Sequence, residues 1–242
     1  MNTLIKIIVT SILALTLFSC NFSMKIGSGV DGNGNIVTTE RSISSDFDQI
    51  KVSEGLDVYI TQANEVSVNV EADENLQDII LTEVENGILR IHTAENIRSS
   101  SSRRINLSIA NVSSIKATSG SDVYSTNTIV AENLNLNTTS GADMKIEVKT
   151  KNLICDATSG SDLIVSGTTD ILKAEATSGS DIRATDLIAN TSNVKATSGA
   201  DISVNTKKEL TAKATSGGDI KYSGNPEKVN ASDSSSGSVK QQ

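Results

Sequence analysis

Hydrophobic and polar residues alternate with a period of two through most of residues 116–238. Such alternation is typical of β-strands that bury one face and expose the other. Two inward columns recur at fixed positions: Ile115, Leu136, Cys155, Ala174, Val194 and Ala212, and, two residues later, Ala117, Thr138, Ala157, Ala176, Ala196 and Ala214. The pattern therefore predicts two or three short strands in each repeat, joined by sharp corners, with the same face inward each time.

A Thr-Ser-Gly-x-Asp motif, always followed by an apolar residue, separates these strands. It begins at Thr118, Thr139, Thr158, Thr177, Thr197 and Thr215. Counting the degenerate Ser235-Ser236-Gly237, its glycines are spaced 21, 19, 19, 20, 18 and 20 residues apart. Units this short cannot bury a core alone and must stack on one another. We therefore predict an all-β solenoid with coils of about 20 residues, spaced about 4.8 Å apart.

The preceding segment, residues 43–115, contains strand-like stretches without the perfect repeat. Gly55-Leu56-Asp57-Val58 carries the same Gly-x-Asp-apolar step as the later motifs. We expect this segment to form less regular coils of the same solenoid or a β cap on it, within one domain spanning 43–242. A separate β domain is the alternative. The polar residues at the C-terminus, 239–242, are expected to fray.

The N-terminus has the features of a bacterial targeting segment. A short positive start precedes the apolar run Ile7 to Phe18, and Leu17-Phe18-Ser19-Cys20 resembles a lipobox. We expect residues 1–19 to be a signal peptide and Cys20 to carry acyl chains that hold the protein at a membrane. An ordinary secretory signal or a bare apolar anchor is the alternative. Asn21, where an Asp would signal inner-membrane retention, favours the outer membrane.

The segment between this cysteine and the first expected strand, residues 20–42, is rich in Gly, Ser and Asn. Such a composition is typical of flexible linkers. We therefore expect a tether that lifts the folded body away from the membrane.

Composition narrows the function classes. The chain has three Phe, three Tyr and no Trp, so its core must consist of aliphatic residues, and aromatic platforms that stack on sugars or bases are not expected. The formal charge of −8 disfavours nucleic acid as a partner. His92 is the single histidine, which excludes a multi-histidine zinc site. Cys155 falls in an inward column and is expected to be a small buried hydrophobe rather than a nucleophile.

The aspartates that follow the turns are the best candidates for a functional surface. They are Asp57, Asp122, Asp143, Asp162, Asp181, Asp201 and Asp219. In stacked coils neighbouring carboxylates lie about 5 Å apart and repel by roughly 1 kcal/mol per pair. Each Asp either accepts hydrogen bonds within its own turn or joins its neighbours in binding Ca²⁺. A carbohydrate-active enzyme with paired carboxylates is a further alternative, although an active site requires one coil that differs from the rest. We assign no catalytic residue and no cofactor.

Upstream of the repeats, the chain resembles the putative auto-transporter adhesin, head GIN domain family. The resemblance is carried by Phe47 to Val52, Gly55 to Gln62, Val66 to Glu71, Leu76 and Gly87 to Ile91, and with the later turns it covers residues 46–238. It implies a right-handed parallel β-helix and a bacterial envelope lipoprotein. We therefore expect a non-enzymatic protein that presents a Thr/Ser/Asp-rich ridge to a glycan or protein partner. A purely structural envelope role is the alternative.

Overall fold

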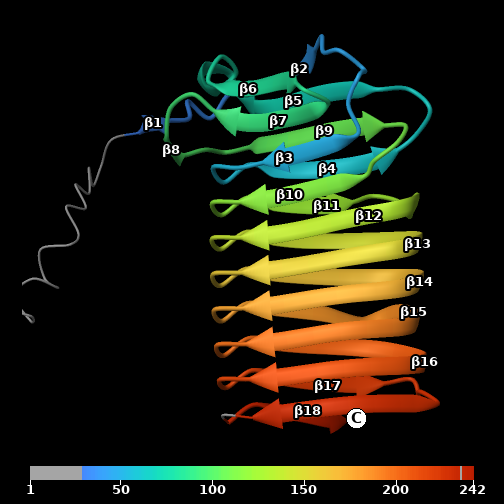
Figure 1. The fold of residues 1–242 in the computed structure, drawn as a ribbon. Helices are drawn as coiled ribbons and strands as arrows, with labels where there is room; N and C mark the ends of the chain where they lie inside the picture. Colours follow the sequence, from blue (N-terminus) through green and yellow to red (C-terminus); the bar gives the residue numbers. More distant parts are fainter. Residues whose placement is uncertain (1–28, 235) are drawn as a thin grey trace, which may run out of the picture.

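Parallel coils stacked along one axis form the protein in the computed structural model, which describes residues 29–234 and 236–242. The predicted β-solenoid is confirmed, with coils of about 19 residues and about 7 turns (Figure 1). The regular stack consists of β10 (Ser114–Thr118), β11 (Asp122–Ser125), β12 (Ile129–Thr139), β13 (Asp143–Thr158), β14 (Asp162–Thr177), β15 (Asp181–Thr197), β16 (Asp201–Thr215), β17 (Asp219–Ser223), β18 (Lys228–Ser234) and β19 (Ser238–Gln241). Among the described residues the one helical element is the 3-10 turn η1 (Glu74–Leu76).

Each central coil is one long strand, which differs from the two or three short strands expected. β13 to β16 contain 15 to 17 residues each. The strand runs along one face, bends at the edge opposite the Thr-Ser-Gly-x-Asp turns and returns along the other face (Figure 1). Because neighbouring coils bend at the same place, pairing continues through most of the bend and no second sharp corner is needed.

The Thr-Ser-Gly-x-Asp motifs form the sharp turn of each coil. Ser119 has φ 57° and Gly120 has φ 69°, and the serine and glycine of the other five motifs have nearly the same angles. Two consecutive left-handed residues define a type I′ turn, and glycine adopts this region at the least cost. The N–H of Gly120 also donates to the carbonyl of Ser140 in the next coil at 3.2 Å, so the turns are bonded to each other.

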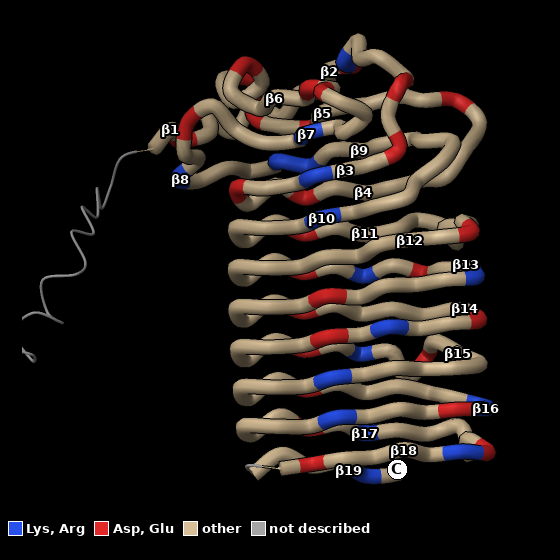
Figure 2. The backbone as a smooth tube through the Cα atoms, in the orientation of Figure 1, with Lys and Arg blue, Asp and Glu red and all other residues tan. Residues whose placement is uncertain are grey.

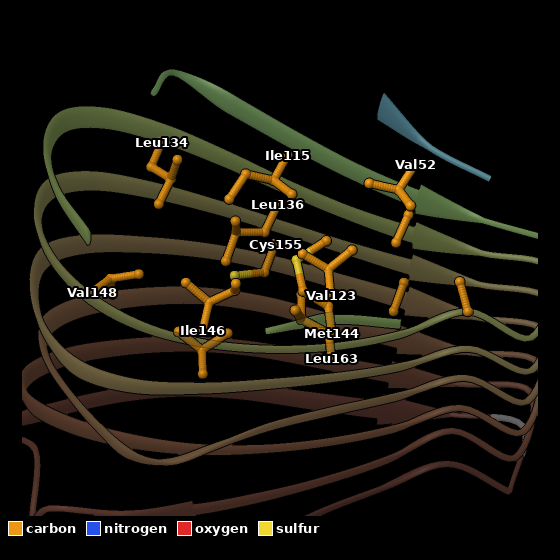
Figure 3. Close-up of a cluster of buried hydrophobic side chains, with 14 of the residues drawn as sticks. Val52, Ile115, Val123, Leu134, Leu136, Met144, Ile146, Val148, Cys155 and Leu163 are labelled. Carbon is orange, nitrogen blue, oxygen red and sulfur yellow. The ribbon is translucent and has the colours of Figure 1, made fainter. Parts of the chain in front are cut away.

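The interior is filled by aliphatic columns from the two faces. Leu136 and Cys155 lie in one column, and Met144 and Leu163 lie opposite them (Figure 3). All four side chains are at most 1% exposed. Cys155 is a buried free thiol, as predicted, and burial raises its pKa. The interior between the two faces is narrow and is filled by these aliphatic side chains. This explains why the chain has so few aromatic residues.

The N-terminal region is both a coil and a cap. Its strands are β1 (Val30–Asp31), β2 (Ile36–Arg41), β3 (Gln49–Val52), β4 (Asp57–Gln62), β5 (Ser67–Asp73), β6 (Ile80–Glu85), β7 (Ile88–Thr93), β8 (Ile97–Ser99) and β9 (Arg103–Ile109). β3 and β4 form a coil that pairs in parallel with β10 and β11 on one side and with β7 and β9 on the other. Antiparallel strands β5 and β6 then cover β9 and β7, and β2 covers β5.

Two predictions about the chain ends are wrong where the structure describes them. Residues 30–31 and 36–41, expected within the flexible tether, are strands, because β1 pairs with β8 and β2 with the otherwise free edge of β5. The expected frayed tail pairs as β19 with β17. The last turn is also shifted by one residue: Gly237 occupies the x position, since Ser238 is in register with Asp219.

The predicted signal peptide at 1–19 and the lipidation site at Cys20 lie outside the described residues. The described residues contain no helix with the length and hydrophobicity of a membrane span.

Candidate functional site

Seven aspartates form one continuous line along the solenoid, which we call the aspartate ladder. It consists of Asp57, Asp122, Asp143, Asp162, Asp181, Asp201 and Asp219, each in register with the next. Arg104 is in register with Asp57 at one end, and Ser238 is in register with Asp219 at the other. The hydroxyl of Ser238 donates to the Asp219 carboxylate at 2.6 Å. The ladder therefore ends on a cation and on a hydroxyl donor.

In the three motifs that have serine at the x position, the turn is closed by that serine and not by the aspartate. The buried hydroxyl of Ser180 donates to the carbonyls of Thr177 and Ala157 at 2.9 and 2.8 Å, and accepts from the N–H of Thr177. Ser121 and Ser161 close their turns in the same way. Among the described contacts, no ladder carboxylate accepts a hydrogen bond from its own turn. The interpretation of the aspartates as turn caps is therefore wrong, and all seven aspartates are at least partly exposed.

Burial makes ionisation of four ladder members costly, and repulsion between neighbouring carboxylates adds to it. Partial burial raises the pKa values of Asp57, Asp122, Asp162 and Asp201. The charges of both ladder neighbours add to this effect at Asp122 and at Asp201. A ligand that donates hydrogen bonds or carries positive charge relieves this repulsion, because it favours the ionised carboxylates.

Cations of the protein itself offset part of the repulsion. Arg183 lies 2.8 Å from Asp181 and 3.3 Å from Asp162, so one guanidinium contacts two ladder members. Arg103 and Arg104 act on Asp57 and oppose the rise in its pKa. Within the described ranges no group of three or more His, Cys, Asp or Glu side chains is arranged to hold a metal ion. The geometry therefore gives no support to the calcium alternative.

A second outward column, which we call the companion column, lies two residues after the ladder. Its members, in stacking order, are Asn106, Tyr59, Tyr124, Lys145, Ile164, Arg183, Ser203, Lys221 and Lys240. The rings of Tyr59 and Tyr124 stack with their centroids 5.1 Å apart and their planes at 25°. The Arg104 guanidinium lies 4.6 Å from the centre of the Tyr59 ring. Two of the three tyrosines thus form an aromatic pair on the surface.

The low aromatic content of the chain gives no indication of this pair. It predicts that aromatic platforms are absent, yet Tyr59 and Tyr124, 65 positions apart in the chain, are adjacent in the stack. The signal was present in the repeated triplets Asp57-Val58-Tyr59 and Asp122-Val123-Tyr124. Aligning the first coil with the later ones predicts that the two rings meet.

Charge on the opposite face is arranged in blocks (Figure 2). The outward column there contains Arg90, Lys51, Lys116, Asn137, Asp156, Glu175, Lys195, Lys213 and Ser232 in stacking order. Like charges are therefore neighbours in this column too. It has no counterpart to the tyrosine pair, so we take the ladder and the companion column as the candidate binding face.

The remaining candidate lies apart from this face. His92 is on β7, and its Nε2 lies 2.9 Å from a Glu83 carboxylate oxygen on the paired strand β6. His92 therefore has a structural role, as one member of a cross-strand pair in the cap.

The structure is similar to solved structures of bacterial proteins. One is a putative adhesin from Bacteroides fragilis (TM-score 0.82, 20% identity, covering 88% of this chain and 100% of that chain). Another is a putative lipid binding protein from Parabacteroides distasonis (TM-score 0.74, 24% identity, covering 89% and 100%). A third is a putative adhesin from Parabacteroides merdae (TM-score 0.72, 19% identity, covering 88% and 99%). At these identities the similarity concerns the fold.

A search of curated proteins found no match. The family model of the putative auto-transporter adhesin, head GIN domain, matches residues 46–226, which include strands β3 to β9 and all six Thr-Ser-Gly-x-Asp turns. The chain therefore belongs to the putative auto-transporter adhesin, head GIN domain family.

Proposed function

We propose that the protein is a non-enzymatic binding protein of the bacterial cell envelope, an adhesin that uses the aspartate ladder and the adjoining turns as its binding face. The observation that carries the proposal is the ladder itself. Seven carboxylates in register, none of them used to close a turn, form a long and repetitive surface on a rigid support. Family membership supports a location in the envelope or at the cell surface.

Repetition suits this face to a repetitive ligand. Consecutive carboxylates are spaced by one coil, about 4.8 Å. A polymer whose donor groups recur along its length can engage several of them at once, and each additional contact is then intramolecular. Weak individual hydrogen bonds can in this way add up to stable adhesion. A glycan or a polar protein segment has the chemistry required.

The experiment compares two variants on arrays of glycans and matrix proteins. The first changes the six motif aspartates, Asp122, Asp143, Asp162, Asp181, Asp201 and Asp219, to Asn. The control changes six exposed acids elsewhere, Asp46, Glu65, Glu95, Glu132, Asp170 and Asp186, to their amides, which alters net charge equally. We expect the ladder variant to lose binding and the control to retain it. Equal binding by both would remove the ladder as the binding face.

The same samples test the enzymatic alternative. Wild-type protein is incubated with acidic and neutral polysaccharides, and the products are assayed for reducing ends and unsaturated sugars. A binding protein leaves both at background. Product formation that disappears in the ladder variant would instead support a carbohydrate-active enzyme.

We further propose that acyl chains on Cys20 hold the protein at the outer membrane. The support is the lipobox-like sequence Leu17-Phe18-Ser19-Cys20. Cells expressing wild type or Cys20→Ser are labelled with a fatty-acid analogue and fractionated. We expect label and membrane association in the wild type and neither in the variant. A labelled or membrane-bound variant would exclude this anchor.

A further inference from the structure

The tyrosine pair borders a shallow hollow on the binding face. The hollow has a volume of about 390 Å³ and is lined by Tyr59, Tyr124, Ser125, Thr126, Lys145, Glu147 and Ser166. Tyr59 is covered on one side by Arg104 and on the other by Tyr124. Tyr124 has Tyr59 on one side and Lys145 as its column neighbour on the other. Both tyrosines nevertheless line the hollow, whose volume is of the size that small ligands occupy.

Polar groups around this hollow are held in place by the protein. The Glu147 carboxylate accepts from the Thr128 hydroxyl at 2.7 Å, and the backbone N–H of Glu147 donates to the Ser125 hydroxyl at 2.9 Å. The Thr126 hydroxyl lies 2.6 Å from that of Thr61. An aromatic ring surrounded by oriented hydroxyls, a carboxylate and an ammonium is suited to a pyranose, whose C–H face packs on the ring while its hydroxyls form hydrogen bonds.

The hollow continues along the solenoid axis. A second hollow of about 270 Å³ shares Tyr124 and Lys145 with the first, and is lined further by Asp143, Asp162 and Arg183. A third hollow shares Arg183 with the second and extends to Asp219. The three form a line beside the ladder. A linear chain of sugar units can follow this line, whereas a single small molecule would occupy only one hollow.

The charge of this line selects among glycans. The seven ladder carboxylates and Glu147 outnumber the six cations beside them, which are Arg103, Arg104, Lys145, Arg183, Lys221 and Lys240. A polyanionic glycan would be repelled, while the hydroxyls of a neutral glycan can donate to the carboxylates. We propose that Tyr124 is the stacking platform for one pyranose of a neutral linear oligosaccharide that lies along the companion column. This inference deepens the proposed binding function and rests on it.

Intrinsic fluorescence provides a direct test, because the chain contains three tyrosines and no tryptophan. Wild-type protein is titrated with hexasaccharides of glucose, mannose and xylose, and with oligogalacturonate as the acidic comparison. We expect at least one neutral hexasaccharide to change tyrosine emission saturably and oligogalacturonate to have no effect. Absence of a response to every neutral hexasaccharide would overturn the proposal.

Two substitutions separate ring stacking from other effects. Tyr124→Ala should raise the dissociation constant about tenfold, the loss expected for one aromatic contact. Tyr124→Phe keeps the ring and should bind within about twofold of wild type, since the Tyr124 hydroxyl makes only a 3.5 Å contact with Asp122. Circular dichroism and thermal unfolding establish that both variants are folded. Equal affinity of Tyr124→Ala and wild type would overturn the assignment.

The outcome for the platform is distinguishable from the outcome for the ladder. Array binding that is lost in the six-aspartate variant but retained by Tyr124→Ala would leave the proposed adhesion intact and remove the platform. Neutral-glycan binding that is lost in Tyr124→Ala but retained by the six-aspartate variant would support the platform and remove the ladder.

Discussion

The regular stack and the N-terminal cap achieve burial by different means. In the stack, residues of the same kind lie above one another, and each coil repeats the contacts of the previous one. In the cap, buried polar groups form contacts that occur once. The carboxylate of Asp73, which is fully buried, accepts from the N–H groups of Gly34, Ser101 and Ser102 at 2.6, 2.8 and 3.2 Å.

The stack and the cap also differ in how the edges of their β-sheets are paired or covered. The backbone N–H and C=O groups of each coil in the stack pair with those of the next coil. A repeating sequence is therefore enough to satisfy these groups in every coil except the last. The cap must close the stack, and it does so with antiparallel strands and with side chains that bond to loop backbone. Unpaired strand edges invite association with other chains. The cap therefore depends on individual residues, and the stack depends on columns.

Interleaving of the two regions should make them unfold together. Coil β3–β4 lies between β7–β9 of the cap and β10–β11 of the stack. Leu163→Ala in the stack and Leu89→Ala in the cap each remove a fully buried side chain and should each cost about 3 kcal/mol. Urea unfolding followed by circular dichroism should show one transition in both variants. Two separate transitions would show that cap and stack are independent.

Asp73→Asn tests whether the stability of the cap depends on this one side chain. The amide lacks the charge that three N–H donors stabilise, and these donors hold the pKa of Asp73 below its usual range although burial opposes them. We expect a fall in Tm of about 5 °C at neutral pH. Asp78→Asn, at an exposed position nearby, is the control and should leave Tm unchanged. The effect should shrink with acidification, because a depressed pKa stabilises the fold only while the carboxylate is ionised.

Gly218→Ser tests whether serine, the most frequent residue at the x position of the motif, is tolerated at that position in every coil. Three of the six motifs have Ser at this x position, but a Cβ at Gly218 would lie 2.7 Å from the carbonyl carbon of Ala196. The backbone must shift, so we expect a loss of about 2 kcal/mol in urea unfolding. Ala200→Ser in the preceding coil is the control, with an expected change below about 1 kcal/mol. Equal effects of both substitutions would contradict the idea that the close approach of the Ala196 backbone requires glycine at position 218.

Asp122→Asn should have the smallest effect and the opposite sign to Asp73→Asn. The pKa of Asp122 is raised by burial and by Asp57 and Asp143, so the folded state binds this proton more tightly than the unfolded state. Ionisation therefore destabilises the fold at neutral pH, and this penalty disappears only when the pH falls below the pKa of an unfolded aspartate, to about 3. We expect a gain of about 0.5 kcal/mol at pH 7, after allowance for solvent screening, and no difference at about pH 3. A loss of stability at pH 7 would contradict repulsion within the ladder.

The sequence repeats made the regular stack predictable. The N-terminal cap and the tyrosine pair were not predictable, because they depend on contacts between residues that are distant in the sequence. Alternation and the recurring glycines predicted the coils, the inward columns and the alignment of the seven aspartates. The edge of β5 that recruits residues 36–41 is created only after β5 pairs with β9. Composition alone therefore misidentified residues 36–41 as linker. For the same reason the low aromatic content predicted no aromatic platform, although the pairing of β4 with β11 brings Tyr59 and Tyr124 together.

The roles of Ser and Asp in the turns were also decided in three dimensions. Both residue types favour turns in sequence statistics, and the motif contains both. Only the folded turn shows that the inward x serine reaches the backbone carbonyls while the next residue, Asp, points outward.

The sequence by itself determined the solenoid, its period and the line of aspartates, because short-range periodicity dictates strand faces and identical units stack in register. The tertiary structure decided what closes the N-terminal end, which group caps each turn and which side chains meet across coils. These features depend on contacts between residues up to 69 positions apart, and no local pattern encodes the distance between such partners.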